Sequence, residues 1–243
     1  MEPARTRPAP PAAFAWLVHA ITASGAVLGF LALMAAIGGD WRLSLFWLIV
    51  ALVVDGLDGS LARWARVKEQ APRIDGNVLD LVVDYLNYVF IPAVLIWREG
   101  LVPEPLLIPL VAAIQLSSLY LFARSDMKSE DNYFRGFPSL WNVVAFYLLL
   151  TRPGPEVGAA IVCLFTLATF APVHFVHPFR VRDYGVVLPI LAAIWAAATT
   201  ALLWPNWGEA VEGALLILSL ATAGILLGMG LLRTLRGPRK VAT

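Results

Sequence analysis

Residues 53–88 read VVDGLDGSLARWARVKEQAPRIDGNVLDLVVDYLNY. In this stretch one apolar segment ends, a short basic connection follows, and a second apolar segment begins. Four aspartates lie at or inside the two apolar segments, namely Asp55, Asp58, Asp80 and Asp84. If both segments cross a membrane and each aspartate faces lipid as an anion, the total cost is on the order of 10 kcal/mol. The four carboxylates are therefore expected to face a shared protein interior.

The composition of the chain places these segments in a membrane. Of its 243 residues, 59% are hydrophobic and 14% are charged, and the mean hydropathy is +0.74. A soluble domain carries more charge, and a helix needs about 20 apolar residues to cross the hydrocarbon core. Candidate spans are predicted at residues 12–37, 42–63, 75–97, 101–123, 138–151, 157–174, 184–204 and 211–232. The expected fold is an all-α polytopic membrane protein, a bundle of about eight transmembrane helices.

The distribution of Lys and Arg predicts the orientation of this bundle, because short cytoplasmic loops retain positive charge. With these spans, one side keeps only three of the 18 basic residues, Arg42, Arg98 and Arg152. The other side carries both termini, which are therefore expected in the cytoplasm. The predicted organisation is a cytoplasmic tail at 1–11, a single transmembrane domain at 12–233 and a second tail at 234–243.

The spacing of the aspartates gives each apolar segment an acidic face, since residues three or four apart lie on one side of a helix. The two faces are formed by Asp55, Asp58 and Ala62 on the second span and by Gly76, Asp80 and Asp84 on the third. The two helices can lie antiparallel with these faces opposed. Carboxylates in one pocket repel unless cations neutralise them, and oxygen ligands without Cys favour Mg²⁺, Mn²⁺ or Ca²⁺. Two divalent ions would balance the four charges.

Small and basic residues beside the aspartates suit a phosphate-containing ligand. Gly59, Ala62 and Gly76 leave room next to the carboxylates, and Arg63 offers a forked donor for phosphate. With metal ions, this set suits phosphoryl transfer to a hydroxyl group. The alternatives are a purely structural role, such as helix capping by Asp75, and the cation pathway of a transporter.

The same residues match a known signature. The pattern Asp-x2-Asp-Gly-x2-Ala-Arg followed by Gly-x3-Asp-x3-Asp resembles that of the CDP-alcohol phosphotransferase family. Its positions are filled by Asp55, Asp58, Gly59, Ala62, Arg63, Gly76, Asp80 and Asp84. The connection between the two halves is longer than the family's usual pattern. That connection and the segments SDMKSEDNYFRGFPSLWNVVAFY (125–147) and FVHPFRVR (175–182) resemble the bacterial phosphatidylcholine synthase family.

The resemblance implies an activity and a set of ligands. CDP-diacylglycerol would be the donor, choline the acceptor, phosphatidylcholine and CMP the products, and Mn²⁺ or Mg²⁺ the cofactor. Asp55, Asp58 and Asp80 would be metal ligands, and Asp84 would be a ligand or the base that takes the hydroxyl proton. The residues expected to contact the CDP moiety are Asp55, Gly59, Ala62, Arg63 and Gly76. The resemblance also suggests a homodimer in the bacterial inner membrane with its active site toward the cytoplasm, with membrane lipids and no nucleic acid among its partners.

A choline site is expected to combine aromatic faces with a carboxylate, because a quaternary ammonium group has no hydrogen-bond donor. The candidates are Tyr85, Tyr88, Tyr133 and Trp141, with Glu130 or Asp131 as the anion. Membrane interfaces collect Tyr and Trp regardless of function, which is the alternative explanation for each aromatic residue.

Basic residues near the end of the sixth span are candidates for an anion site. Arg180 and Arg182 could hold a donor phosphate or a lipid headgroup, although the positive-inside bias alone also accounts for them. His174 and His177 lie three apart and are expected at an interface rather than on a metal.

Three functions therefore compete. The first is phosphatidylcholine synthesis, the second is the same chemistry with inositol, serine or a phosphorylated alcohol as acceptor, and the third is divalent-cation transport. A phosphorylated acceptor calls for additional basic residues facing the pocket, and the aromatic surroundings of Asp84 argue against one. A transporter needs carboxylates on a path to both faces, whereas these gather toward the cytoplasmic side.

Overall fold

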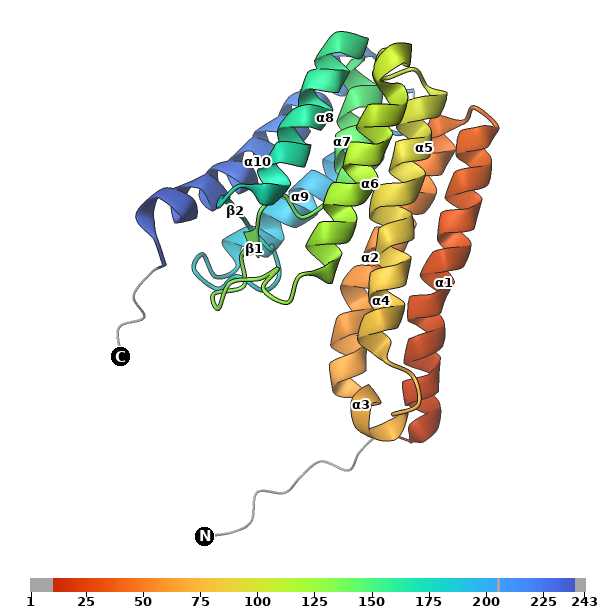
Figure 1. The fold of residues 1–243 in the computed structure, drawn as a ribbon, viewed down its shortest axis with the longest axis vertical. Coiled ribbons are helices and arrows are strands. Elements are labelled where there is room, and N and C mark those ends of the chain that lie inside the picture. Colours follow the sequence, from red (N-terminus) through yellow and green to blue (C-terminus); the bar gives the residue numbers. More distant parts are fainter. Residues whose placement is uncertain (1–10, 205, 239–243) are drawn as a thin grey trace.

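Helices form nearly all of the regular structure in the computed structural model, which describes residues 11–204 and 206–238. The helical segments long and apolar enough to cross a membrane are α1 (Ala12–Ile37), α2 (Trp41–Trp64), Gly76–Arg98, Glu104–Ala123 and α10 (Glu209–Arg236). The shorter apolar helices are α7 (Trp141–Thr151), α8 (Pro155–Phe170) and α9 (Val187–Ala201). Each predicted span overlaps one of these helices along most of its length, which confirms the all-α polytopic membrane fold (Figure 1).

Two of the shorter helices, α8 and α9, end earlier than the predicted spans, and α7 begins later than predicted. The predicted span 157–174 is too long, because α8 ends at Phe170 and Ala171 is extended ahead of Pro172. The 11 residues of α7 are roughly 16 Å long at 1.5 Å per residue, so this helix does not cross the hydrocarbon core alone.

The predicted tails fall mostly on residues outside the described part of the chain, which leaves out 1–10 and 239–243. At the C-terminal end α10 continues to Arg236, past the predicted boundary at 233.

The second half of the acidic signature lies on a helix with three parts. These are α4 (Gly76–Asp84), the π-helical turn η1 (Tyr85–Phe90) and α5 (Ile91–Arg98). A short helix, α3 (Val67–Gln70), lies in the connection from α2. Asp75 caps α4, because its Oδ1 accepts hydrogen bonds from the backbone N–H groups of Asn77 and Val78 at 2.9 and 3.4 Å. A π turn is rare and is frequently found at functional sites, and here it follows Asp84 directly.

The first helix holds both acidic helices in place. α1 packs along α2 and also against α4 and α5 (Figure 1). Two glycines allow the close approach, since a Cβ on Gly25 would overlap the side chain of Val83 and one on Gly29 would overlap Asn87. Asn87 Nδ2 also donates a hydrogen bond to the carbonyl oxygen of Gly25 at 3.1 Å.

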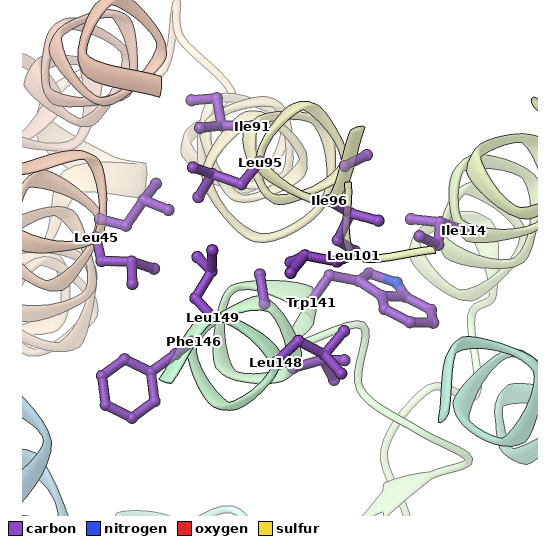
Figure 2. Close-up of a cluster of buried hydrophobic side chains, with 14 of the residues drawn as sticks. Leu45, Ile91, Leu95, Ile96, Leu101, Ile114, Trp141, Phe146, Leu148 and Leu149 are labelled. Atoms are coloured by element: carbon purple, nitrogen blue, oxygen red, sulfur yellow. The ribbon is translucent and has the colours of Figure 1, made fainter. Parts of the chain in front are cut away.

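The largest hydrophobic core surrounds α7 (Figure 2). Leu45 from α2, Leu95 from α5 and Leu149 from α7 point toward one another there. Trp141 at the start of α7 is fully buried, and its Nε1 donates to Ser118 Oγ of α6 (Leu107–Ala123) at 2.9 Å. A single 3-10 turn, η2 (Glu104–Leu106), precedes α6. This core fixes α2 and α5 relative to each other, and with them the acidic faces.

Two loops meet between the ends of α6 and α10 (Figure 1). β1 (Phe134–Arg135) and β2 (His174–Phe175) pair there in antiparallel fashion, with Phe134 opposite Phe175. We call residues 124–137 and 171–182 together the strap.

The strap is attached closely to α10. A Cβ on Gly230 would overlap the carbonyl oxygen of His174, so only glycine permits this approach. The backbone N–H of His174 donates to Thr234 Oγ1 at 2.7 Å. An ion pair between Asp131 and Arg233 also joins the first strap loop to α10, with an N–O distance of 2.6 Å.

Candidate active site

Three carboxylates from two helices meet in the half of the bundle where α2 ends and α4 begins. Asp55 from α2 and Asp80 and Asp84 from α4 each offer one oxygen, and these oxygens lie within 4.8 Å of one another. Asp80 and Asp84 are one helical turn apart on the same side of α4. All three side chains are half-buried. We call these residues the acidic trio, and it joins the two acidic faces that the sequence predicts.

The acidic trio fits a divalent cation. Two oxygens on one ion lie up to about 4 Å apart for Mg²⁺ and about 5 Å apart for Ca²⁺, given their metal–oxygen distances. The separations of 4.8 Å or less fall in this range after small side-chain rotations. Carboxylate oxygens are also the ligand type that Mg²⁺ and Mn²⁺ prefer. Within the described residues, no other group of three His, Cys, Asp or Glu side chains meets in this way.

Asp58, the fourth aspartate, is placed differently from the trio. It is only 6% exposed, and its Oδ2 accepts a hydrogen bond of 2.6 Å from Thr22 Oγ1 on α1. Thr22 was not singled out in the sequence, because a lone threonine in an apolar span has no distinguishing pattern. The hydrogen bond from Thr22 explains how the buried carboxylate of Asp58 is accommodated next to three others. Metal ligation by Asp58 stays a prediction.

Two predicted choline residues lie in the π turn that follows Asp84. Tyr88 lies in the π turn and is buried, and its hydroxyl donates to Asp55 Oδ2 at 2.8 Å. Tyr85 donates to Gln115 Oε1 on α6 and packs edge-on against Phe122. The π turn thus places two phenol rings directly after Asp84.

Two arginines lie over the glycine of the first half-signature. A Cβ built on Gly59 would stand 3.6 Å from Arg63 Nη1 and 3.9 Å from Arg180 Nη2. The strap therefore brings Arg180 to the signature helix, and both Arg180 and Arg182 are exposed. Ala62 is half-buried on the same helix. The structure joins Arg63 and Arg180, which are far apart in the sequence, beside the acidic trio's helix.

Gly76, expected beside the CDP moiety, lies against α1. A Cβ at this position would stand 3.2 Å from Cε1 of His19. His19 is buried on the same helix as Thr22. Close helix packing accounts for glycine at this position, and a contact with the donor stays a prediction.

The other choline candidates lie on the strap or in the core. Glu130 is exposed, whereas Asp131 pairs with Arg233 at 2.6 Å. Burial alone would raise the pKa of Asp131, but hydrogen bonds from Arg233 and Ser129 outweigh it and hold the pKa below its usual value. Tyr133 is fully buried and donates to Asp183 Oδ2 at 2.9 Å. With Trp141 in the core, these contacts favour a structural role for most of this set.

Lys128, which the sequence analysis did not single out, lies within electrostatic reach of the acidic trio, and His177 lies near Lys128 on the strap. Lys128 interacts electrostatically with Asp80, Asp84 and Asp55, and its pKa is lowered by burial and by the charge of Arg180, which outweigh these carboxylates. Burial, followed by the charges of Lys128 and Arg180, lowers the pKa of His177 to about 4. The alternating charges of segment 124–135 were the available signal, but they are also typical of a solvated loop.

Comparison with known proteins agrees with this geometry. Residues 16–171 match the family described as CDP-alcohol phosphatidyltransferase, a range that includes the acidic trio and the first strap loop. The phosphatidylcholine synthase of Pseudomonas aeruginosa is 48% identical over 181 residues, which cover 74% of this chain and 76% of that protein. The phosphatidylcholine synthase of Bradyrhizobium diazoefficiens is 45% identical over 194 residues, covering 79% and 72%. That of Mesorhizobium japonicum is 40% identical over 194 residues, with the same coverage. The chain is an integral membrane protein that belongs to the CDP-alcohol phosphatidyltransferase family.

Proposed function

We propose that the protein is a phosphatidylcholine synthase, which transfers the phosphatidyl group of CDP-diacylglycerol to choline and releases CMP. The observation that carries the proposal is the acidic trio inside a membrane bundle, formed by Asp55, Asp80 and Asp84 at the signature positions of the family. The similarity to named phosphatidylcholine synthases over most of the chain supports choline as the acceptor.

In the proposed reaction, the hydroxyl oxygen of choline attacks the phosphorus that carries diacylglycerol. A new oxygen–phosphorus bond forms, and the bond from that phosphorus to the oxygen of CMP breaks. The hydroxyl proton passes to a carboxylate, and Asp84 is the candidate because it is the member of the trio that adjoins the aromatic π turn. Mn²⁺ or Mg²⁺ held by the trio would polarise the donor phosphate and make the hydroxyl more acidic. Asp58 is the candidate to complete a second ion site.

The chain's own residues have separate proposed tasks. Arg63 and Arg180 converge over Gly59 and suit the anionic phosphates of the donor. Tyr85 and Tyr88 lie one and four residues after Asp84, where their rings can receive the trimethylammonium group of choline. The basic connections at this end of the bundle support a position at the cytoplasmic face of a bacterial inner membrane. A homodimer is proposed from the family resemblance alone.

The deciding experiment uses the purified full chain with CDP-diacylglycerol, Mn²⁺ and a panel of alcohols. CMP release and the lipid product are measured together. Release with choline and formation of phosphatidylcholine are expected. CMP release with inositol, serine or glycerol 3-phosphate but not with choline would show that the acceptor is a different alcohol and that the phosphatidyl transfer is the same. No CMP release with any alcohol, combined with cation uptake into proteoliposomes, would show that the protein is a transporter and not this enzyme.

A further inference from the structure

Among the residues that the structure describes, some cations of the bundle are neutralised by ion pairs, whereas the three cations beside the active site are not. In the described part of the chain, Arg124, Arg135, Arg152 and Arg233 each form an ion pair within 4.0 Å. Lys128, Arg63 and Arg180 form none within that distance across the same residues. Arg63 donates only to Ser60 Oγ, at 3.0 Å. Three positive charges are thus gathered beside a reaction centre without a carboxylate to neutralise them directly.

Lys128 is the most unusual of the three. It is half-buried, whereas Arg63 and Arg180 are exposed. It interacts with each member of the acidic trio and is repelled by Arg180. A half-buried ammonium group without a direct ion pair is costly. An anion that lies between Lys128 and the trio's helices would remove this cost.

The strap holds Lys128 in a defined position. Its backbone bridges to Phe134, and its Nζ lies 4.9 Å from the centre of the Phe134 ring. That ring stacks on His177 with a centroid distance of 5.4 Å. Lys128 therefore does not extend into solvent from a mobile loop.

The turn that follows Lys128 is fastened to α10. Ser129 Oγ donates to Asp131 Oδ1 at 2.6 Å, and the backbone N–H of Tyr133 donates to Ser129 Oγ at 3.1 Å. Arg233 of α10 then pairs with Asp131 at 2.6 Å and lies over the ring of Tyr133. The chain of contacts connects the last helix of the bundle to the lysine beside the acidic trio.

We propose that Lys128 binds a phosphate of the CDP-linked donor at the acidic trio, and that the Asp131–Arg233 ion pair positions Lys128 for this contact. The identity of the donor rests on the proposed function. The ammonium group contributes a charge-assisted hydrogen bond opposite the trio, together with Arg63 and Arg180. Lys128 lies outside the signature, so the strap adds a phosphate ligand to those of the two acidic helices.

The test compares Lys128→Met with wild type and with Lys68→Met. Lys68 is an exposed lysine of α3 and serves as the matched control. The measurements are kcat/KM for CDP-diacylglycerol, KM for choline and the inhibition constant of CDP. Loss of a charge-assisted contact is expected to lower donor kcat/KM and CDP affinity by about 10- to 100-fold. In Lys128→Met the KM for choline is expected to change by less than about twofold. In the Lys68→Met control all three measured constants are expected to stay within about twofold of wild type.

The variant Lys128→Arg distinguishes loss of the phosphate contact from misfolding of the protein. Arginine keeps the charge, so this variant is expected to keep most of the CDP affinity that Lys128→Met loses. Equal losses in both variants would overturn the proposal, as would CDP affinity within about twofold of wild type in Lys128→Met. An altered response to phosphatidylglycerol in vesicles with unchanged CDP affinity would assign Lys128 to lipid headgroups and also overturn it.

The positioning role is tested by Asp131→Asn. Asp131→Asn is expected to weaken CDP binding less than Lys128→Met does. In the double variant, Asp131→Asn is expected to add little to the loss of CDP affinity that Lys128→Met causes. Full additivity would show that Asp131 does not act through Lys128. CDP binding also separates the two proposals, because a wild-type chain that binds CDP but rejects choline overturns phosphatidylcholine synthesis alone.

Discussion

The two sides of the active site are built in different ways. The carboxylate side stands on α2 and α4, where helix periodicity aligns Asp80 with Asp84 and α1 packs against both helices. The cation side stands on the strap, whose only regular structure in the described residues is a pair of two-residue strands. There a few side-chain bonds, such as Asp131–Arg233, fix the backbone.

This difference indicates how each side responds to substitution. A helix stabilised by long packed faces tolerates the loss of one polar group and keeps its shape, so a change in the trio alters chemistry more than structure. A strap held by few contacts changes position when one contact is lost. Substitutions there are expected to alter donor binding and local stability together.

The largest effect is expected on the carboxylate side, from Asp84→Asn. The amide keeps the size of the side chain but removes the negative charge and the proton acceptor. We expect CMP release to fall by about 10²- to 10⁴-fold, as for the loss of a general base, with an unchanged unfolding temperature. Activity is measured under saturating donor and choline. Retained turnover would remove Asp84 as base, and a collapsed unfolding temperature would show that this side is less robust than argued.

The sequence predicts the carboxylate side well because its information is local. Helix period, hydropathy and the cost of charge in a membrane together place Asp55, Asp80 and Asp84 on opposed faces. The contact of Tyr88 with Asp55 depends on the π turn after Asp84, and no residue pattern in that segment distinguishes a π turn from an ordinary helix. Thr22 likewise becomes informative only when packing sets it against Asp58.

The sequence named Arg63 and Arg180 as anion-binding candidates, but it did not predict how the cation side is arranged, because its partners are distant in the sequence. Lys128 and Arg180 converge only after two loops pair as strands, and Asp131 meets Arg233 on the last helix. Asp131 was a choline candidate because it is a carboxylate near aromatic residues, and its ion pair with Arg233 could not be anticipated from the sequence. Loop contacts of this range leave little signal in one sequence.

The second largest effect is expected on the strap, from Gly230→Ala. The added methyl group would overlap the carbonyl oxygen of His174, a backbone atom that cannot rotate away. Overpacking of this kind costs about 1–3 kcal/mol, so the unfolding temperature and the affinity for CDP are both expected to fall. Gly228→Ala is the matched control, because a Cβ there meets open space on the same helix. Equal behaviour of the two variants would mean that the strap does not depend on this contact.

A smaller effect is expected from Thr22→Val, which removes the hydroxyl that donates to Asp58. The variant leaves a buried carboxylate without this donor, and a hydrogen bond to a charged group contributes about 1.5–3 kcal/mol. Activity is expected to fall by about tenfold and the requirement for Mn²⁺ to shift. Thr22→Ser retains the hydroxyl and is expected to behave as wild type. If Thr22→Val is also active at wild-type level over a Mn²⁺ titration, Asp58 needs no support from α1.

The smallest effect concerns the pH dependence of the strap. The pKa of His177 is about 4 in the folded protein, because burial and the charges of Lys128 and Arg180 disfavour the imidazolium ion. In an unfolded chain the pKa is about 6.5. Between these two pKa values the unfolded state binds more protons than the folded state. The contribution of neutral His177 to folding stability is therefore present at neutral pH and is lost as pH falls from about 6.5 toward about 4.

His177→Gln removes this proton uptake and is expected to flatten the decline in unfolding temperature over the same pH range. His174→Gln is the matched control on the neighbouring strand, where the pKa is also lowered by burial and by Arg233. A larger flattening in His177→Gln than in His174→Gln would place the stronger positive field on the side of the strap that faces the trio. Parallel curves for wild type and His177→Gln would mean that this field is too weak to matter. In that case the strap would be held by its contacts with α10 without measurable electrostatic strain from its own cations.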